Sequence, residues 1–261
     1  MEHISLILSD LDGTLFRNDK SISNRTKEAI IAAQKQGILF GISTSRALMN
    51  AVKFLDGIKP DITITNGGGL VYYCTKDGSK EKIYDSQFTK DQTHAIIQKT
   101  FEVLGPQTVI SFDNENGLYS NGDEDDFGDK YWTKVDFNNF IEAAMKICIA
   151  TQDKNAVEKI ISVVGKENVD ALPFSDIPWY KLTNSGATKD KAIEALSDRM
   201  KIPLSQIISF GDDFNDIGML KLCGKGIAMK NAIPEVKATA DEVCGSNEED
   251  GVAEWILSNL S

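Results

Sequence analysis

Three short apolar runs near the start of the chain alternate with two segments of helical periodicity. The runs cover residues 4–8, 38–42 and 61–65, and the segments at 26–36 and 48–55 place apolar side chains on one helical face. A parallel strand that is covered on both sides has a continuous apolar sequence, and a helical crossover joins it to the next strand. This alternation therefore predicts a parallel sheet with helices packed against it.

Hairpin signals replace this alternation in the middle of the chain. Apolar segments flank Lys76-Asp77-Gly78 and Asp113-Asn114-Glu115-Asn116, and segments with helical character lie among them at 91–104 and 155–164. Hairpins mixed with helices are typical of an α+β module with an antiparallel sheet. The first pattern returns from Lys189 onwards.

We therefore predict an α/β fold, with a Rossmann-like, doubly wound parallel-sheet core and an inserted α+β cap domain. The predicted core comprises residues 1–82 and 185–261, and the predicted cap comprises residues 83–184. A chain of 261 residues is long enough for one large domain with such an insertion. The acidic run at 123–126 is predicted to be a solvated loop, because like charges disfavour packing.

The composition restricts the possible partners and location. The chain has 28 basic and 39 acidic residues, a net charge of -11, which argues against a general nucleic-acid binder. No apolar run approaches the roughly 18 residues of a membrane helix, and the N-terminus lacks the pattern of a signal peptide. The four cysteines form no C-x-x-C pair, so we expect reduced thiols, no zinc site and a cytoplasmic location.

The first motif whose side chains could take part in a reaction is Asp10-Leu11-Asp12-Gly13-Thr14, directly after the first apolar run. Two carboxylates would then lie at the carboxyl end of the first strand, the edge where open parallel sheets bind ligands. Gly13 permits a sharp turn, and Thr14 can brace the loop by side-chain-to-backbone hydrogen bonds. The alternative interpretation is an Asx-type turn without a chemical role.

A second acidic motif, Gly211-Asp212-Asp213-Phe214-Asn215-Asp216, follows the apolar run at 207–210. Its carboxylates could complete a magnesium site, because Mg²⁺ prefers hard oxygen ligands. Asn215 could orient a phosphate or the loop itself. Helix capping by Asp213, Asn215 or Asp216 is the alternative, and both interpretations can hold for different residues.

Two further residues fit a phosphate site. Thr44 follows the second predicted strand, where a hydroxyl and the next backbone N–H groups can bind an anion. Lys189 begins a predicted helix and offers a mobile positive charge. Taken singly, an N-cap threonine and a surface lysine are the plainer interpretations.

Together and in this order, these motifs resemble those of the haloacid-dehalogenase-like hydrolase superfamily, over essentially the whole chain. The large insertion, with Asn66-Gly67 just before it, resembles the Cof-type or IIB branch, which carries an α/β cap. One position departs from that branch, which usually has Ala-Thr-Gly-Arg where this chain has Ser43-Thr44-Ser45-Arg46. We expect the backbone at Ser45 to avoid positive φ, because only glycine adopts it freely.

The resemblance implies hydrolysis of a phosphoester through an aspartyl-phosphate, with Mg²⁺ as the cofactor. It implies Asp10 as the nucleophile and Asp12 as the acid and base. The implied magnesium ligands are Asp10, the Asp12 backbone carbonyl and Asp212. The implied phosphate-binding groups are the Leu11 amide, Thr44, Ser45, Lys189 and Asn215, and Asp216 and Asp213 are assigned supporting roles.

We expect a magnesium-dependent phosphatase that acts on phosphomonoesters of small, sugar-phosphate-like metabolites. Two alternatives stay open: a phosphotransferase or phosphosugar mutase, and a non-catalytic phosphate-ligand sensor, which would not need Asp12. The expected partner is a small phosphorylated metabolite, with no nucleic acid and no membrane, and the sequence assigns no oligomeric state. The resemblance implies that the cap reads the substrate, and candidates chosen by residue type are Tyr84, His94, Trp132, Trp179 and Lys181.

Overall fold

The computed structural model describes residues 3–75, 78–123, 132–174 and 177–260. The chain divides into two compact units, which we call the core unit (residues 1–85 and 188–261) and the inserted unit (residues 86–187). Both divisions fall a few residues after the boundaries expected from the sequence. The reason is that strand pairing in the core unit continues as far as Asp85, which lies opposite Leu70.

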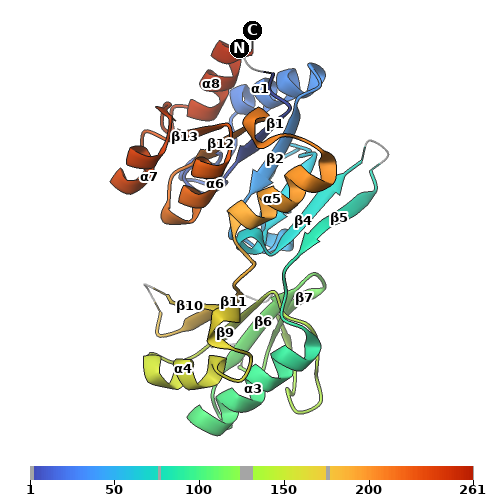
Figure 1. Ribbon diagram of the computed structural model, residues 1–261, viewed down its shortest axis with the longest axis vertical. Coiled ribbons are helices and arrows are strands. Elements are labelled where there is room, and N and C mark those ends of the chain that lie inside the picture. The colour runs from blue at the N-terminus through green and yellow to red at the C-terminus, as the bar shows by residue number, and fades with distance from the viewer. Residues whose placement is uncertain (1–2, 76–77, 124–131, 175–176, 261) are drawn as a thin grey trace. The chain divides into compact units, whose positions relative to one another are not determined.

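The core unit is built on one eight-stranded sheet with the strand order β14-β13-β12-β1-β2-β3-β4-β5 (Figure 1). Neighbouring strands are parallel from β14 to β3, and the last two strands, β4 and β5, are antiparallel. The strand bounds are β1 Leu6–Ser9, β2 Leu39–Ser43, β3 Ile62–Thr65, β4 Leu70–Cys74, β5 Lys80–Asp85, β12 Ile207–Gly211, β13 Lys225–Ala228 and β14 Glu242–Val243.

Helices cover both faces of this sheet, and β1 is buried between them. Ile7 packs in a cluster with residues of α1 and α8, whereas Leu6 and Leu8 point to the other face and pack with residues of α5 and α6. The core is therefore doubly wound, as predicted. The helix bounds are α1 Asn24–Lys35, α2 Leu48–Val52, α5 Lys189–Met200, α6 Ile217–Leu222, α7 Pro234–Thr239 and α8 Gly251–Asn259.

The direction of winding changes at β1. From β1 the chain proceeds to β2 and β3 on one side, and from β12 it proceeds to β13 and β14 on the other. Ser9 and Phe210, near the ends of β1 and β12, lie opposite each other in the parallel register. Two loops thus leave adjacent strands at the carboxyl edge of the sheet, where open α/β sheets bind their ligands.

The inserted unit has a six-stranded sheet with the order β10-β11-β9-β6-β7-β8, and helices α3 and α4 lie on one side of it (Figure 1). All neighbouring strands are antiparallel except β7 and β8. The bounds are α3 Lys90–Leu104, β6 Ile110–Asn114, β7 Gly117–Ser120, β8 Trp132–Lys134, β9 Lys146–Ile149, α4 Lys154–Ile161, β10 Val169–Pro173 and β11 Tyr180–Asn184.

Several elements differ from the sequence-based expectation. The sequence analysis did not predict β8, β10, α7 or β14, which are short and carry no distinct apolar period. Tyr84, a candidate for the cap, lies in β5 and belongs to the core unit. Most of the acidic run at 123–126 and the turn at 76–77 lie outside the described residues. No helix in the described part of the chain is long and apolar enough to cross a membrane.

Gly68 lies where the chain after β3 meets the start of α5. Its φ is +110°, and a Cβ added there would lie 2.1 Å from the backbone oxygen of Thr188. Gly37 also has positive φ, +86°, but a Cβ there would meet no atom within 4 Å. An alanine at Gly37 would therefore strain the backbone alone, whereas an alanine at Gly68 would strain the backbone and also overlap with Thr188.

We predict that Gly68→Ala lowers the free energy of unfolding by about 2–5 kcal/mol, because backbone strain and overpacking add together. Gly37→Ala should lower it by only about 1–2 kcal/mol, because only the backbone is strained. Urea denaturation followed by circular dichroism measures both values. Equal losses in the two variants would contradict the close approach at Gly68.

Candidate active site

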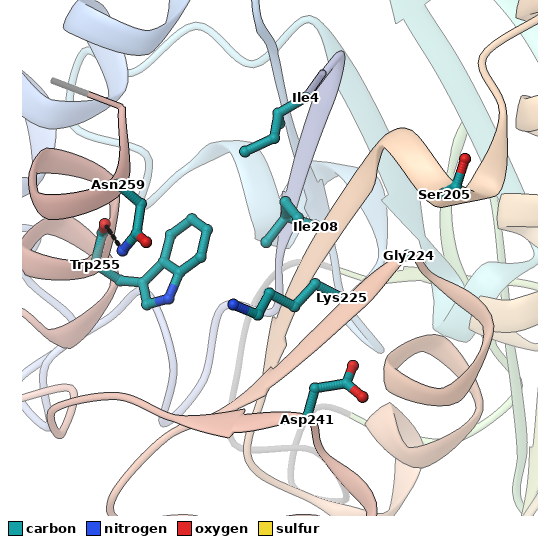
Figure 2. A pocket seen from close by; sticks show the side chains of 8 residues that line it. All are labelled: Ile4, Ser205, Ile208, Gly224, Lys225, Asp241, Trp255 and Asn259. Carbon is teal, nitrogen blue, oxygen red and sulfur yellow. Dashed lines mark hydrogen bonds between the residues drawn. The ribbon is translucent and has the colours of Figure 1, made fainter. Parts of the chain in front are cut away.

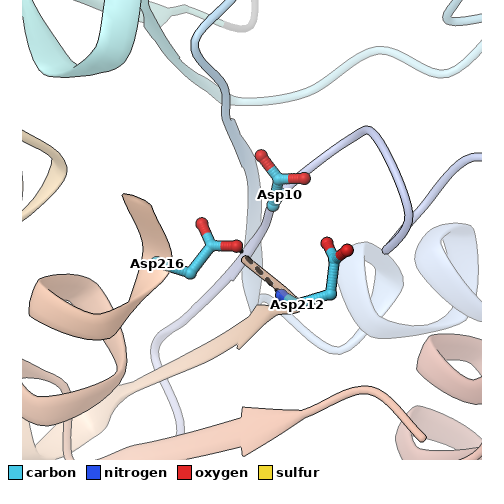
Figure 3. Close-up of side chains that lie close together, drawn as sticks. All are labelled: Asp10, Asp212 and Asp216. Atoms are coloured by element: carbon cyan, nitrogen blue, oxygen red, sulfur yellow. Dashed lines mark hydrogen bonds between the residues drawn. The ribbon is translucent and has the colours of Figure 1, made fainter. Parts of the chain in front are cut away.

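Three aspartates from the two adjacent loops form a cluster at the carboxyl edge of the core sheet. One carboxylate oxygen each from Asp10, Asp212 and Asp216 lies within 4.8 Å of the others (Figure 3). Asp10 directly follows β1, and its backbone N–H donates to the Phe210 carbonyl oxygen at 3.0 Å. This bond extends the pairing of β1 with β12 by one residue and holds the Asp10 loop against the Asp212 loop.

Asp216 is buried and holds the turn after β12 by hydrogen bonds. Its Oδ2 accepts the backbone N–H groups of Asp212 at 2.9 Å and Asp213 at 3.1 Å, and its Oδ1 accepts Lys189 Nζ at 2.6 Å. Both carboxylate oxygens therefore have donors, and the side chain is only 2% exposed. Asp216 therefore holds the turn after β12 and the Lys189 ammonium group in place.

Lys189, the first residue of α5, places a buried ammonium group beside the cluster. Its Nζ donates to Asp10 Oδ1 at 2.7 Å, to Asp216 Oδ1 and to the Ser43 carbonyl oxygen, both at 2.6 Å. Burial works to lower the pKa of Lys189, but the two carboxylates overcome this effect and raise it above the ordinary value. Lys189 is therefore charged throughout the neutral pH range.

The carboxyl groups of Asp10 and Asp212 lie in an environment that disfavours their charge. Burial raises the pKa of Asp10 to about 7; Lys189 opposes this shift, while Asp216 and Asp212 add to it. Burial also raises the pKa of Asp212, to about 6. The negative charges of Asp216 and Asp213 add to this shift, whereas a hydrogen bond of 2.7 Å from the Thr14 hydroxyl opposes it. One more cation beside these two groups would relieve the repulsion.

The donor set fits a divalent cation. Asp10 Oδ2 and Asp212 Oδ2 receive no hydrogen bond from any residue in the described ranges, so each aspartate keeps one oxygen available. Carboxylate oxygens are the hard ligands that Mg²⁺ prefers. Asp216 completes the geometric cluster, but both of its oxygens are already occupied, so Asp10 and Asp212 are the better ligands.

Asp12 lies in a different environment, paired with two cations. Arg46 donates Nε to Oδ2 at 2.6 Å and Nη2 to Oδ1 at 2.7 Å, and Lys20 Nζ donates to Oδ1 at 2.8 Å. Burial alone would raise the pKa of Asp12, but these hydrogen bonds and charges together lower it. The guanidinium of Arg46 lies over the rings of Phe16 and Phe54, with centroids at 5.7 and 5.0 Å.

Arg46 and Lys20 are site residues that the sequence analysis did not assign. Arg46 was visible within Ser43-Thr44-Ser45-Arg46, but nothing in that motif indicates that its partner is Asp12. Lys20 stands in the loop after β1 with no motif around it, so no sequence signal was available. The pairing depends on how the two loops fold back towards each other.

Gly13 and Thr14 bring the two acidic loops close together. Gly13 has a φ of +79°, and a Cβ there would lie 2.3 Å from Asp212 Oδ2. Thr14 does brace a loop, as expected, but its hydroxyl bonds to the Asp212 side chain and not to nearby backbone. Asn231 Nδ2 adds a hydrogen bond of 2.7 Å to the Gly13 carbonyl oxygen.

The predicted phosphate-binding residues differ in exposure: some are buried and others are exposed. Thr44 is buried, and its hydroxyl accepts the backbone N–H of Arg46 at 3.2 Å. Ser45 is exposed and is not among the residues with positive φ, as expected for that position. Asn215 is exposed on the 3-10 turn η5 (Phe214–Asp216). The Leu11 side chain is fully buried in the apolar core and so fixes the loop after β1 to the core.

Asp213 has a capping role. Its carboxylate accepts the Phe214 backbone N–H at 2.8 Å at the start of η5, and its side chain is exposed. Asp216 supplies the reciprocal half of this capping box by accepting the Asp213 N–H. Of the two interpretations that the sequence left open for Asp213, the structure supports capping.

A separate cavity of about 390 Å³ lies at the opposite edge of the core sheet (Figure 2). Ile4 precedes β1, Ile208 is near the start of β12 and Lys225 begins β13, so the amino ends of the strands line it. Lys225 Nζ points towards the Trp255 ring, 5.6 Å from its centroid, and pairs with Glu242 at 2.7 Å. The lining includes none of the three clustered aspartates, so the carboxyl edge is the candidate active site.

The chain is similar to known proteins along nearly its full length. The family model described as haloacid dehalogenase-like hydrolase matches residues 7–256. The 5-amino-6-(5-phospho-D-ribitylamino)uracil phosphatase YitU of Bacillus subtilis is 28% identical, and the match covers 98% of this chain and 97% of that protein.

Solved structures support the same fold. BT1666 of Bacteroides thetaiotaomicron, a phosphatase of the haloalkanoate (HAD) superfamily, matches with a TM-score of 0.78 and 22% identity, over 98% of this chain and 95% of the other. The HAD subclass IIB sugar phosphatase BT4131 matches with a TM-score of 0.72 and 24% identity, over 97% and 98%. With the family model matched along residues 7–256, this chain belongs to the haloacid dehalogenase-like hydrolases and is a phosphoric monoester hydrolase.

Proposed function

We propose that this protein is a magnesium-dependent phosphatase that hydrolyses phosphomonoesters of small metabolites through an aspartyl-phosphate. The observation that carries the proposal is the position of Asp10, a buried carboxylate between the Lys189 ammonium and the carboxylate of Asp212. A nucleophile needs an available oxygen and neighbouring positive charge, because the substrate is itself an anion.

In the first step, one carboxylate oxygen of Asp10 attacks phosphorus, and the bond from phosphorus to the ester oxygen breaks. The product on the protein is an acyl phosphate of Asp10, and the leaving alkoxide takes a proton from Asp12. In the second step, water attacks phosphorus, Asp12 accepts a proton from that water, and inorganic phosphate leaves with the Asp10 carboxylate restored.

The ion pair of Asp12 with Arg46 and Lys20 favours its carboxylate form, which is the form that accepts a proton in the second step. For the first step Asp12 must carry a proton. We propose that Arg46 leaves Asp12 at that stage, since a protonated carboxyl group loses its attraction for a guanidinium.

The remaining polar groups at this edge suit the phosphoryl oxygens. We propose that these oxygens are held by the Leu11 backbone amide, Thr44, Ser45, Lys189 and Asn215. A magnesium ion would be held by the Asp10 and Asp212 carboxylates and the Asp12 backbone carbonyl. When bound, Mg²⁺ neutralises charge between the nucleophile and the phosphate.

We propose that the substrate is a small, sugar-phosphate-like metabolite and that side chains of the inserted unit determine which one is accepted. We also propose that the protein acts in the cytoplasm. The relative YitU is named for a substrate with a phosphorylated ribityl chain, which supports a phosphate on a polyol carbon. The net charge of -11 agrees with a phosphate site that depends on a few local cations and not on a basic surface.

The magnesium requirement is tested by removal and replacement. We predict that the protein releases p-nitrophenol from p-nitrophenyl phosphate in Mg²⁺, loses this activity in excess EDTA and regains it when Mg²⁺ is restored. Mg²⁺ should also raise the melting temperature of the wild type but not of Asp212→Ala, because binding to the folded state is stabilising. Full turnover in EDTA would contradict the metal requirement.

The role of Asp10 is tested by Asp10→Asn, which keeps the shape of the side chain and removes the nucleophile. We predict that kcat falls to less than about one thousandth of the wild-type value. Asp198→Asn, an exposed aspartate on α5, is the matched control and should retain wild-type kcat. Retained turnover in Asp10→Asn, with a circular dichroism spectrum like the wild type, would remove Asp10 from the nucleophile role.

The role of Asp12 is tested by Asp12→Asn under single-turnover conditions. With p-nitrophenyl phosphate the leaving p-nitrophenolate needs no proton from Asp12, so the phosphorylated protein still forms. Without a base for the attacking water it should accumulate, and its hydrolysis should slow by about 100-fold or more. Acid quenching followed by intact-protein mass spectrometry detects the added phosphoryl group. A variant that turns over at the wild-type rate would exclude Asp12 from proton transfer.

A further inference from the structure

One short loop of the core unit makes hydrogen bonds to both acidic loops. We call it the bridging loop; it comprises residues 229–233 and connects β13 to α7. Two of its backbone N–H groups donate to the second acidic loop, to the carbonyl oxygens of Gly211 and Asp212, each at 3.1 Å. In the same loop, Asn231 Nδ2 donates to the Gly13 carbonyl oxygen at 2.7 Å. The bridging loop therefore holds the first and the second acidic loop at once.

The orientation of the Asn231 amide follows from its two partners. Its Oδ1 accepts the backbone N–H of Asn247 at 3.0 Å. A backbone N–H only donates and a carbonyl oxygen only accepts, so the NH₂ group is the one that faces Gly13. Asn247 is buried, and its own Nδ2 donates to the Phe16 carbonyl oxygen at 3.0 Å. The residue that orients Asn231 is therefore anchored in the core unit.

Gly13 is the residue whose position this amide controls. A glycine by itself leaves the peptide groups on either side free to rotate, and Gly13 has a φ of +79°. Two hydrogen bonds remove this freedom. Asn231 holds the Gly13 carbonyl oxygen, and the hydroxyl of the next residue, Thr14, donates to Asp212 Oδ1 at 2.7 Å. The backbone on both sides of Gly13 is thus held against the second acidic loop.

The peptide group before Gly13 carries the Asp12 carbonyl oxygen, which is a magnesium ligand in the proposed function. This oxygen receives no hydrogen bond from any residue that the structure describes, so it is available to a cation. A backbone ligand has no side-chain torsion with which to adjust, and its direction depends on the neighbouring peptide groups. Groups that orient a ligand without touching the metal change metal affinity by about 10–100-fold.

We infer that Asn231 is a positioning residue of the magnesium site. Through Gly13, its amide aims the Asp12 carbonyl oxygen and keeps the two acidic loops at the separation that a shared cation needs. This inference rests on the proposed magnesium-dependent function and adds to it a residue that does not touch the metal. The Asn231 side chain is exposed, so replacing it removes the hydrogen bonds without leaving a cavity in the core.

The test measures the binding of Mg²⁺ alone to the full chain by isothermal titration calorimetry. Asn231→Leu keeps a branched side chain of similar size and removes both hydrogen-bonding groups. We expect its Kd for Mg²⁺ to rise about tenfold or more above the wild-type value. With p-nitrophenyl phosphate, kcat at saturating Mg²⁺ should stay within about threefold of the wild type, because Asp10, Asp12 and Asp212 are all retained.

A second measurement reports on the loop in the absence of metal. In EDTA, the backbone amides of residues 11–16 should exchange hydrogen faster in Asn231→Leu than in the wild type, because the restraint on Gly13 is lost. Hydrogen exchange followed by mass spectrometry of peptides detects this difference.

Two further variants make the result specific. Asn231→Gln keeps the amide on a longer side chain and should have a Kd for Mg²⁺ between the values of the wild type and Asn231→Leu. Lys230→Gln removes an exposed side chain of the same loop that pairs with Glu249 at 3.1 Å, and it should keep the wild-type Kd. Thermal unfolding of each variant in EDTA shows whether a loss of affinity comes with a loss of fold.

The possible outcomes are distinct. Equal affinity for Mg²⁺ in the wild type and Asn231→Leu would overturn the inference and leave the magnesium proposal intact. A wild type that binds no Mg²⁺ would overturn the magnesium requirement and the inference with it. If Asn231→Leu lowers the melting temperature in EDTA but keeps the wild-type affinity, the role of Asn231 is only structural, and the inference is wrong.

Discussion

The arrangement of the site depends on one buried ammonium group, that of Lys189. It binds Asp10 after β1, the Ser43 carbonyl oxygen at the end of β2 and Asp216 in the turn after β12. Three separate segments therefore share one positive charge in the interior. Breaking a buried ion pair from one side costs about 3–5 kcal/mol, because the remaining charges are left without a partner. Lys189 thus contributes to the fold as well as to the electrostatics of the site.

The topology of the sheet explains why the Lys189 ammonium group reaches both Asp10 and Asp216. β1 is central, and the winding direction changes beside it, so the loops after β1 and β12 leave the sheet next to each other. Gly13 allows these loops to approach closely, and Gly68 allows the start of α5 to reach the same edge. The acidic loops repel each other, and the repulsion is balanced by Lys189 and by the cation that we propose for Asp10 and Asp212.

The two units distribute charge in different ways. In the core unit, the acids outnumber the cations at the site, and the magnesium ion that we propose would balance them. In the inserted unit, Lys146 pairs with Asp113 at 2.7 Å, and Asp170 on β10 attracts the charge of Lys181. The net charge of -11 acts against non-specific binding of large polyanions.

The sequence alone determined the layout of the molecule and the two loops that carry its acidic cluster. Apolar runs with turns at their ends predicted β1, β2, β3 and β12, and the two acidic motifs predicted which loops carry the chemistry. Only the tertiary structure decided which charges pair. It placed Arg46 and Lys20 on Asp12 and occupied both oxygens of Asp216. The physical reason is that local patterns set the period and ends of each element, whereas a charge pair depends on the course of loops that are distant in sequence.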